Sequence, residues 1–388
     1  MFFILFAVYK TIQPNSIMLK KVIALLLISV TAHAQTVVKK DTGTINGAKY
    51  QILFPANWSK KLVVYAHGYE FMGSPKQSSN PRFDKSMAPF LERGYAVAAS
   101  DYAHMGLAHE QGVNDTEALR SYFFKNYGEP DSTFIVGNSM GGGISIATIE
   151  HYADYYDGAL PMCPLAGRIY LQTRKEFDMF ATFNGLFPGI APSLHTIFDP
   201  KEANKTVSMG EAFQKAGKMR EAIIAKDSLL GVAFAHRFDM KFDDLAFALA
   251  FGEGVLRDVA KKAGGNPYDN TNTLYGRFPD NLLVNQRAER LAATVDQNVL
   301  FNRQEKTGDL HKPTLVLHTI YDQLIPADFA VVSYENMVQQ QGNQAYYTVK
   351  YTNGQGHCNF TEAQTGRAFD ELRQWVKTGK KATAGYLE

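Results

Sequence analysis

A glycine-flanked serine between a predicted strand and a predicted helix is the feature that most constrains this chain. The β-branched and aromatic run Thr133–Val136 leads into Gly-Asn-Ser-Met-Gly at positions 137–141, and apolar residues at helical spacing follow. Gly-x-Ser-x-Gly in this context makes a turn so tight that the serine takes a strained backbone and its neighbours must lack bulky side chains. The pattern predicts that Ser139 is a nucleophile. The simpler alternative is a serine that caps a helix.

Apolar runs that alternate with helical segments predict an α/β fold with a mostly parallel, doubly wound sheet. Strands are expected over residues 44–55, 62–66, 95–100, 133–137, 158–163, 314–318 and 346–351, the first of them antiparallel. Between the fifth and sixth of these runs the pattern is helical, with helices expected over 209–225, 243–263 and 285–294.

This break in the pattern predicts a core of two segments and an insertion. The core is expected to comprise residues 35–167 and 309–388, and residues 168–308 are expected to form a largely helical cap. Such a cap would lie over the carboxyl ends of the strands, the edge at which open α/β sheets bind ligands.

The two strands near the carboxyl end bring candidate partners for Ser139. A serine hydroxyl needs a base to take its proton, and the base needs a third group to fix its tautomer. Asp322 follows the first of these strands, and His357 follows the second in a glycine-flanked loop. The order serine, aspartate, histidine is the one expected after a nucleophile elbow. Asp328 or Asp101 could supply the acid instead, and His357 could be a surface histidine.

A developing oxyanion needs preorganised donors, and two backbone amides are placed to supply them. The amide of Met140 lies at the helix start, directly after the serine. The amide of Tyr69 lies in the loop after the strand 62–66, beyond His67 and Gly68. The Tyr69 ring could also line an acyl pocket or be an ordinary loop aromatic.

The chain has two cysteines, Cys163 and Cys358. Cys358 follows His357 directly, and Cys163 ends a predicted strand near the elbow, so the two sulfurs could meet at one edge of the sheet. An even pair in an exported protein can form a bridge. The alternative is two separate buried thiols, and the spacing does not suggest a zinc site.

Taken together, His67-Gly68-Tyr69, the run 137–142, Asp322 and Gly356-His357 resemble the α/β-hydrolase superfamily. The resemblance covers residues 44–167 and 313–378. It implies a serine hydrolase with an eight-stranded, mostly parallel sheet and no cofactor.

The pair His357-Cys358 also resembles tannases and feruloyl esterases. In those enzymes the cysteine after the histidine is bridged to a cysteine next to the nucleophile. Asn138 stands at that position here, and Cys163 could take the same tethering role.

Residues 1–34 are typical of a secretory signal peptide. They hold no acidic residue, and Lys20 and Lys21 precede a short apolar run that ends in Ala-His-Ala at 32–34. Met18 is a natural start for this signal. The run is shorter than the roughly 20 residues of a spanning helix, although an uncleaved anchor is the alternative. The mature chain is expected to be exported, periplasmic or extracellular, without a membrane span.

Charge and histidine spacing favour neither nucleic acid nor metal as a partner. Removal of residues 1–34, which carry three lysines and no acid, takes the formal net charge from +2 to −1. A near-neutral chain without a basic block lacks the electrostatic footprint of a nucleic-acid binder. His104 and His109 match no common ligand spacing, so no metal and no cofactor are expected.

The first hypothesis for function is an exported carboxylic-ester hydrolase that works through an acyl-enzyme with Ser139, His357 and Asp322. The alternatives are a prolyl-oligopeptidase-like peptidase and a non-catalytic ligand-binding protein on a hydrolase scaffold. The substrate is expected to be a small ester, with an aryl or apolar acyl group if the aromatics of the cap line its pocket rather than pack the cap itself. Those aromatic and methionine residues are Phe177, Met179, Phe180, Phe183, Phe187 and Phe198.

Overall fold

A nine-stranded sheet organises the described residues of the computed structural model, which are 37–76, 80, 82–202, 205–301 and 303–388. The strand order is β1-β2-β4-β3-β5-β6-β7-β8-β9. The signal peptide expected over 1–34, with its start at Met18, lies outside the described residues. The strands are β1 (Val37–Ile45), β2 (Ala48–Pro55), β3 (Lys61–Ala66), β4 (Tyr95–Ser100), β5 (Ser132–Asn138), β6 (Gly158–Met162), β7 (Thr314–Tyr321), β8 (Tyr347–Gln355) and β9 (Gly385–Tyr386).

The sheet is antiparallel at one edge and parallel elsewhere. β1 and β2 form a hairpin through Asn46 and Gly47, both with positive φ, as a two-residue hairpin turn requires. β2 pairs antiparallel with β4, and every later pair is parallel. The resemblance implied eight strands. The ninth is β9, two residues long, which pairs with Lys350 and Tyr351 of β8.

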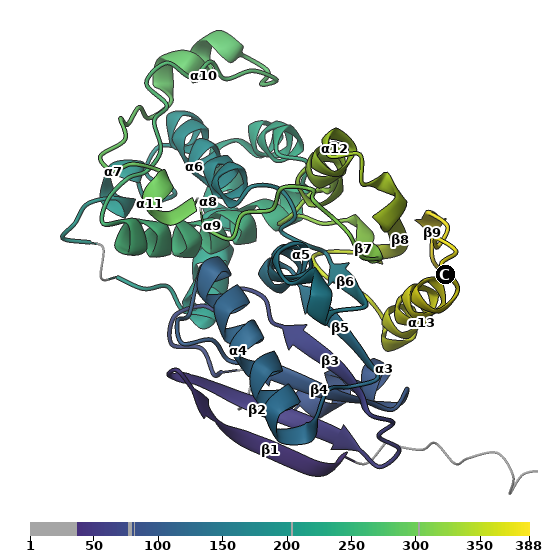
Figure 1. Ribbon diagram of the computed structural model, residues 1–388. Helices are drawn as coiled ribbons and strands as arrows, with labels where there is room; N and C mark the ends of the chain where they lie inside the picture. The colour runs from purple at the N-terminus through teal and green to yellow at the C-terminus, as the bar shows by residue number, and fades with distance from the viewer. Residues whose placement is uncertain (1–36, 77–79, 81, 203–204, 302) are drawn as a thin grey trace, which may run out of the picture. The chain divides into compact units, whose positions relative to one another are not determined.

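Helices cover both faces of the sheet, as the alternation of strands and helices predicts (Figure 1). In β3, Val63 and Tyr65 face one cluster of buried residues, and Leu62 and Val64 face the other. The first cluster includes residues of α2 (Phe83–Ser86), α3 (Ala88–Leu91) and α13 (Glu362–Thr378). The second includes residues of α4 (His109–Tyr127), α5 (Met140–His151) and α12 (Ser333–Gln340). Short helical turns are η2 (Ala153–Tyr155), η3 (Asp328–Val332) and η4 (Gln344–Tyr346).

A helical insertion separates β6 from β7, as Figure 1 shows. Its helices are α6 (Ile169–Leu186), α7 (Leu194–Ile197), α8 (Met209–Arg237), α9 (Phe242–Ala263), α10 (Asn281–Arg287) and α11 (Asn298–Phe301). Local sequence sets several of their ends. Ser208 and Glu211 form a capping box that starts α8, and Gly264 ends α9 in the left-handed conformation.

Two helices of the insertion have bounds that differ from those predicted from the sequence. α8 continues past residue 225 to Arg237 and bends at Asp227, where φ is −170° and ψ is 99°. The helix expected over 285–294 is wrong, because α10 starts after the cap residue Asp280 and stops at Arg287. Beyond it the backbone bonds to distant partners: the Glu289 amide donates to Ala181 O.

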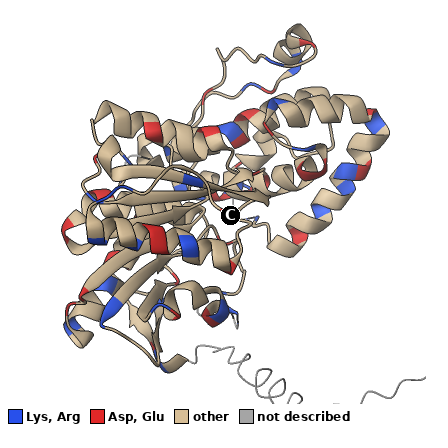
Figure 2. Cartoon of the chain, turned by 90° about the vertical axis from the view of Figure 1, so that its right-hand side faces the viewer, with Lys and Arg blue, Asp and Glu red and all other residues tan. Residues whose placement is uncertain are grey.

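Acidic and basic side chains are interspersed over the helices seen in Figure 2. In the described part of the chain, no helix combines the length and the apolar character that a bilayer crossing requires.

Candidate active site

Ser139 lies on a strained turn between β5 and α5. Its φ of 59° and ψ of −123° are outside the regions that non-glycine residues prefer. A Cβ at Gly137 would collide with the Gly141 carbonyl, and a Cβ at Gly141 would collide with the Ala66 carbonyl. The Ser139 amide donates to Met162 O at 2.9 Å, which ties the turn to β6. The turn therefore requires both glycines and presents the serine at the end of the strand.

The structure brings the three predicted residues together although they are far apart in sequence. His357 Nε2 lies 2.8 Å from Ser139 Oγ, and His357 Nδ1 lies 2.7 Å from Asp322 Oδ2. Because a carboxylate only accepts, Nδ1–H donates to Asp322 and leaves Nε2 to accept the serine hydroxyl. Of the alternative acids, Asp328 is exposed at the start of η3, and Asp101 follows β4.

Asp322 is held as a buried carboxylate. Its side chain is 0% exposed, and its Oδ1 accepts the amides of Leu324 at 2.9 Å and Ile325 at 2.8 Å. Burial alone would raise the pKa of Asp322. The hydrogen bond and charge of His357, with the Ile325 amide, outweigh burial and place the pKa below its usual value. The group therefore stays ionised beside the imidazole. The His357 backbone is fixed too, since its amide donates to Gln323 Oε1 at 2.9 Å.

A disulfide joins Cys163 to Cys358, the pairing that the sequence left open against two separate thiols. Cys163 follows β6, and its amide donates to Leu317 O of β7 at 2.8 Å. The Cys358 sulfur lies 3.5 Å from His357 Nε2. The bridge therefore fixes the loop that carries His357 to the ends of two neighbouring strands.

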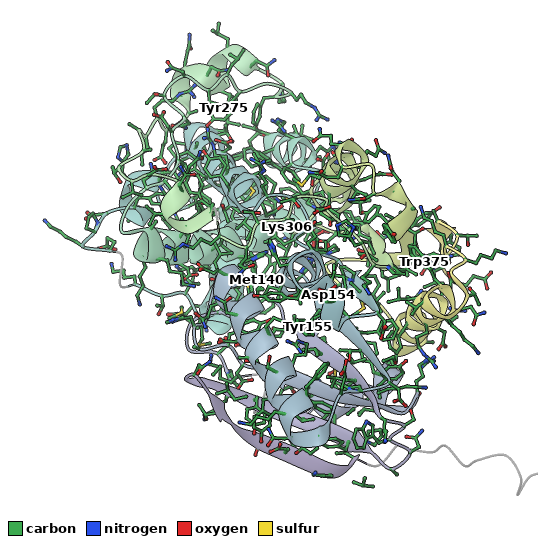
Figure 3. The ribbon with its side chains drawn as sticks, viewed as in Figure 1. Met140, Asp154, Tyr155, Tyr275, Lys306 and Trp375 are labelled. Carbon is green, nitrogen blue, oxygen red and sulfur yellow. A yellow bond between two sulfur atoms is a disulfide. The ribbon has the colours of Figure 1, made fainter. Side chains whose placement is uncertain are left out.

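The two backbone amides expected to bind an oxyanion belong to residues that lie close to Ser139. Met140, labelled in Figure 3, is the first residue of α5. Backbone amides in the first turn of a helix have no acceptor within that helix. Tyr69 follows Gly68, and a Cβ built on Gly68 would lie 3.2 Å from Ser139 Cβ. The loop that contains the Tyr69 amide thus passes directly against the serine.

His67 holds this loop in place through its ring. Its ring stacks on Tyr102 with centroids 3.9 Å apart, and its Nδ1 lies 2.8 Å from Gly68 O. Burial lowers the pKa of His67 to about 4, against smaller opposing effects of the Gly68 carbonyl and Asp101. The ring is therefore neutral at physiological pH and donates from Nδ1 to Gly68 O. In the sequence, His67 stands out only as part of a motif, because stacking on a distant tyrosine leaves no local pattern.

Ser139 and His357 line a pocket that residues of the helical insertion also line. About 490 Å³ of space that no atom fills lies in and in front of the pocket, including open solvent at its mouth, and only about 50 Å³ of it can hold the centre of a water-sized molecule. Its lining residues are Tyr69, Leu107, Ser139, Met140, Leu165, Gln172, Thr173, Glu176, Phe251, Val255, Leu324, Ile325 and His357. Most of this lining is apolar, as in typical small-molecule sites.

Sequence reasoning missed the polar side chains that α6 contributes to this pocket. Glu176 lies four residues after Gln172 and three after Thr173, so it is a neighbour of both on the helix surface, and all three line the pocket. Gln172 Nε2 and Lys175 Nζ both donate to Leu324 O, at 3.0 and 2.9 Å. The only available signal was the presence of polar residues on a face of α6 that is otherwise apolar and buried.

Within the described residues, one group of histidine, cysteine and acidic side chains is close enough to share a metal ion. It consists of Cys163, His357 and Cys358, whose ligand atoms lie within 4.8 Å of one another. Both sulfurs are in the disulfide and both imidazole nitrogens have partners. This donor set does not fit a metal site.

Comparisons with known proteins give several similarities. Residues 28–185 match the model of a family described as tannase-like and of unknown function. The chain is 20% identical to an o-phthalyl amidase of Xanthobacter agilis, over 90% of each protein. Feruloyl esterase B of Aspergillus oryzae is 14% identical, with a TM-score of 0.48 over 88% of this chain and 81% of that one. The Pyrococcus furiosus esterase Pf2001 is 14% identical, with a TM-score of 0.44 over 87% of this chain and 91% of that one.

Three features identify the fold of this chain: the strand order, the antiparallel β2, and the strand–turn–helix that carries Ser139. The chain has the α/β-hydrolase fold, and it is similar to esterases and to an amidase.

Proposed function

We propose that the chain is a serine hydrolase that cleaves carboxylic esters through an acyl-enzyme intermediate. The observation that carries this proposal is the continuous chain of hydrogen bonds from Asp322 through His357 to Ser139, at the edge of a largely apolar pocket. Hydrogen-bond reach between nucleophile, base and orienting acid is the signature of an activated serine.

In acylation, His357 Nε2 takes the hydroxyl proton of Ser139 as Oγ attacks the ester carbonyl. Asp322 stays ionised, keeps the imidazole in the correct tautomer and stabilises its charged form. The amides of Met140 and Tyr69 donate to the developing oxyanion. Each such donor contributes about 2.7–4 kcal/mol to the stability of the transition state. The imidazolium then protonates the leaving alcohol.

In deacylation, His357 accepts a proton from water as the water oxygen attacks the acyl carbonyl, and the same amides bind the oxyanion. The bond from the acyl carbon to Oγ then breaks, and the imidazolium returns its proton to Ser139 Oγ. The products are a carboxylic acid and free Ser139. No group beyond these side chains and water is needed to balance the reaction. The helical insertion, residues 168–308, acts as a cap that shapes the substrate pocket through α6 and α9.

Ser139→Ala tests the nucleophile. The variant should lose turnover of short p-nitrophenyl esters and labelling by a fluorophosphonate probe while it keeps its fold. Ser86→Ala, which changes an exposed serine of α2, is the matched control and should keep both. Unchanged turnover or labelling in Ser139→Ala would refute the assignment. A wild-type chain that binds esters but neither cleaves them nor labels would favour the non-catalytic binding protein.

A second candidate is amide hydrolysis, because the amidase match covers 90% of each protein. An amide needs the same nucleophile and oxyanion donors, with a stronger demand on His357 to protonate the leaving nitrogen. Paired esters and amides of one acyl group, with short chromogenic peptides beside them, would separate an esterase, an amidase and a peptidase.

Export is part of the proposal. The composition of residues 1–34 supports a cleaved signal, and a disulfide beside the active site is of a kind that persists in oxidising compartments. Amino-terminal sequencing of the product from an exporting host should give Gln35 first. A product that stays inside the cell with residues 1–34 attached would contradict export.

A further inference from the structure

One wall of the Ser139 pocket is polar, and it belongs to a single helix. Gln172, Thr173 and Glu176 of α6 line the pocket, whereas α9 contributes the apolar Phe251 and Val255. All three polar residues are buried. Burying a polar side chain costs free energy unless the side chain has hydrogen-bond partners. Their partners therefore indicate what a ligand must offer.

Gln172 has one polar atom engaged and one that is not. Its residue is 8% exposed, and its Nε2 donates to Leu324 O at 3.0 Å. A carbonyl oxygen can only accept, so this bond fixes which end of the amide is nitrogen. Among the described residues, Gln172 Oε1 is a buried acceptor without a hydrogen-bond partner. An unsatisfied buried acceptor costs about 1–3 kcal/mol, and a donor on a bound molecule would recover it.

The two neighbours also present acceptors. Thr173 Oγ1–H donates to Ile169 O at 2.9 Å, which leaves its lone pairs as acceptors for a ligand or for the neighbouring Tyr268 hydroxyl. Glu176 Oε1 lies 3.3 Å from Lys175 Nζ. Burial raises the pKa of Glu176, and Lys175 opposes that shift.

A glycine of the facing helix α9 makes room for the second carboxyl oxygen of Glu176. A Cβ built on Gly252 of α9 would lie 2.8 Å from Glu176 Oε2. The missing side chain of residue 252 therefore leaves room for the Glu176 carboxyl group beside the pocket.

We propose that Gln172, assisted by Glu176, selects substrates that carry a neutral hydrogen-bond donor, a hydroxyl or an N–H, on the group held beneath α6. This rests on the proposed function, because it assigns a substrate class to the same site. A carboxylate on the substrate would face acceptors only. A cation would gain little, because Lys175 already balances the charge of Glu176. The apolar walls fit the carbon body of such a substrate.

Matched aryl esters test the inference. One series varies the acyl group as 4-hydroxybenzoate, 4-methoxybenzoate or benzoate of one alcohol, and a second varies the leaving group as the corresponding phenyl acetates. Hydroxyl and methoxyl have similar electronic effects, so their comparison isolates the donor. In at least one series kcat/KM should favour the hydroxyl over the methoxyl by about 10-fold, as one neutral hydrogen bond supplies. In Gln172→Met this ratio should fall towards one.

Leu171→Met is the control variant, because Leu171 is an exposed residue of the same helix that does not line the Ser139 pocket. Its hydroxyl-to-methoxyl ratio should match that of the wild type. A ratio near one for the wild type in both series, or a ratio that survives Gln172→Met, would overturn the inference.

Binding to Ser139→Ala, measured by calorimetry with the same ester pairs, gives the ratio without turnover. A wild type that cleaves through Ser139 without hydroxyl preference would leave the proposed function standing and remove only this inference. A hydroxyl preference in binding, in a protein whose wild type shows no turnover, would remove the proposed function and leave the role of Gln172 in ligand choice standing.

Discussion

Cys163 and Cys358 are joined by a disulfide that spans 195 residues of sequence and lies directly beside His357. Both cysteines have positive φ, 41° and 54°, which L-residues rarely adopt. Strained backbone of this kind persists where surrounding structure holds it, and it is common next to active sites. The bridge thus connects the end of β6, which also holds the Ser139 amide through Met162, to the loop that carries His357.

Reduction of this disulfide should therefore lower both stability and catalysis. In the chain-entropy account, closing a loop of this length stabilises the fold by up to about 5 kcal/mol. Cys163→Ala/Cys358→Ala should unfold at a lower temperature than the wild type and show a reduced kcat, because His357 loses a covalent tether. Treatment of the wild type with reductant should reproduce both effects, and treatment of the double variant should change neither. Unaltered kcat after complete reduction would show that the tether does not position the histidine.

The backbone amide at position 69 can be tested because proline removes an N–H. Tyr69→Pro should lower kcat by about 10²–10³-fold, the usual effect of deleting one oxyanion donor. Tyr69→Ala keeps the amide and removes only the ring, which lines the pocket. Its loss should be smaller and should fall mainly on KM. Equal kcat values for the two variants would show that the Tyr69 amide does not donate to the oxyanion.

Ser139, Asp322 and His357 could be predicted because each lies at a position that local sequence marks. The turn at Ser139 needs glycines on both sides, and Asp322 and His357 each follow an apolar strand in the expected order. Helix α13 has similarly local signals at both ends, a capping box at its start and a left-handed glycine after its last residue.

The remaining features depend on partners far away in sequence. The segment after Arg287 leaves the helix because its amides bond to Ala181 and Asn270. β9 is a two-residue strand that pairs with the edge of β8, a distant segment of the chain. Gln172 has the spacing of any core residue of α6, and its pocket position appears only once α6 is placed against the loop after Asp322.

His67 should make stability fall at mildly acidic pH. Burial lowers its folded pKa from 6.5 to about 4, so the unfolded chain binds the proton more tightly between these values. The stabilising contribution is therefore complete above pH 6.5 and is lost as pH falls towards 4, by about 3 kcal/mol in total. In His67→Asn, which can still donate to Gly68 O, urea unfolding between pH 4.5 and 7.5 should show a shallower pH slope. His109 and His318, whose pKa values burial also lowers, would keep a residual slope. An unchanged slope would contradict the assignment to His67.

Asp258 should be the residue that holds α9 to the core beside the pocket. Its Oδ2 accepts the Leu107 amide, and Lys262 Nζ donates to it at 2.9 Å and to Met105 O at 2.7 Å. Asp258→Ala leaves the largely buried Lys262 without its counter-ion, so the free energy of unfolding should fall by about 3–5 kcal/mol. Asp258→Ala/Lys262→Met removes that unpaired charge and should recover part of the loss in chemical denaturation. Asp243→Ala breaks an exposed ion pair between α8 and α9 and should cost less than about 1 kcal/mol. If the single and double variants were equally unstable, packing rather than charge pairing would hold this end of α9.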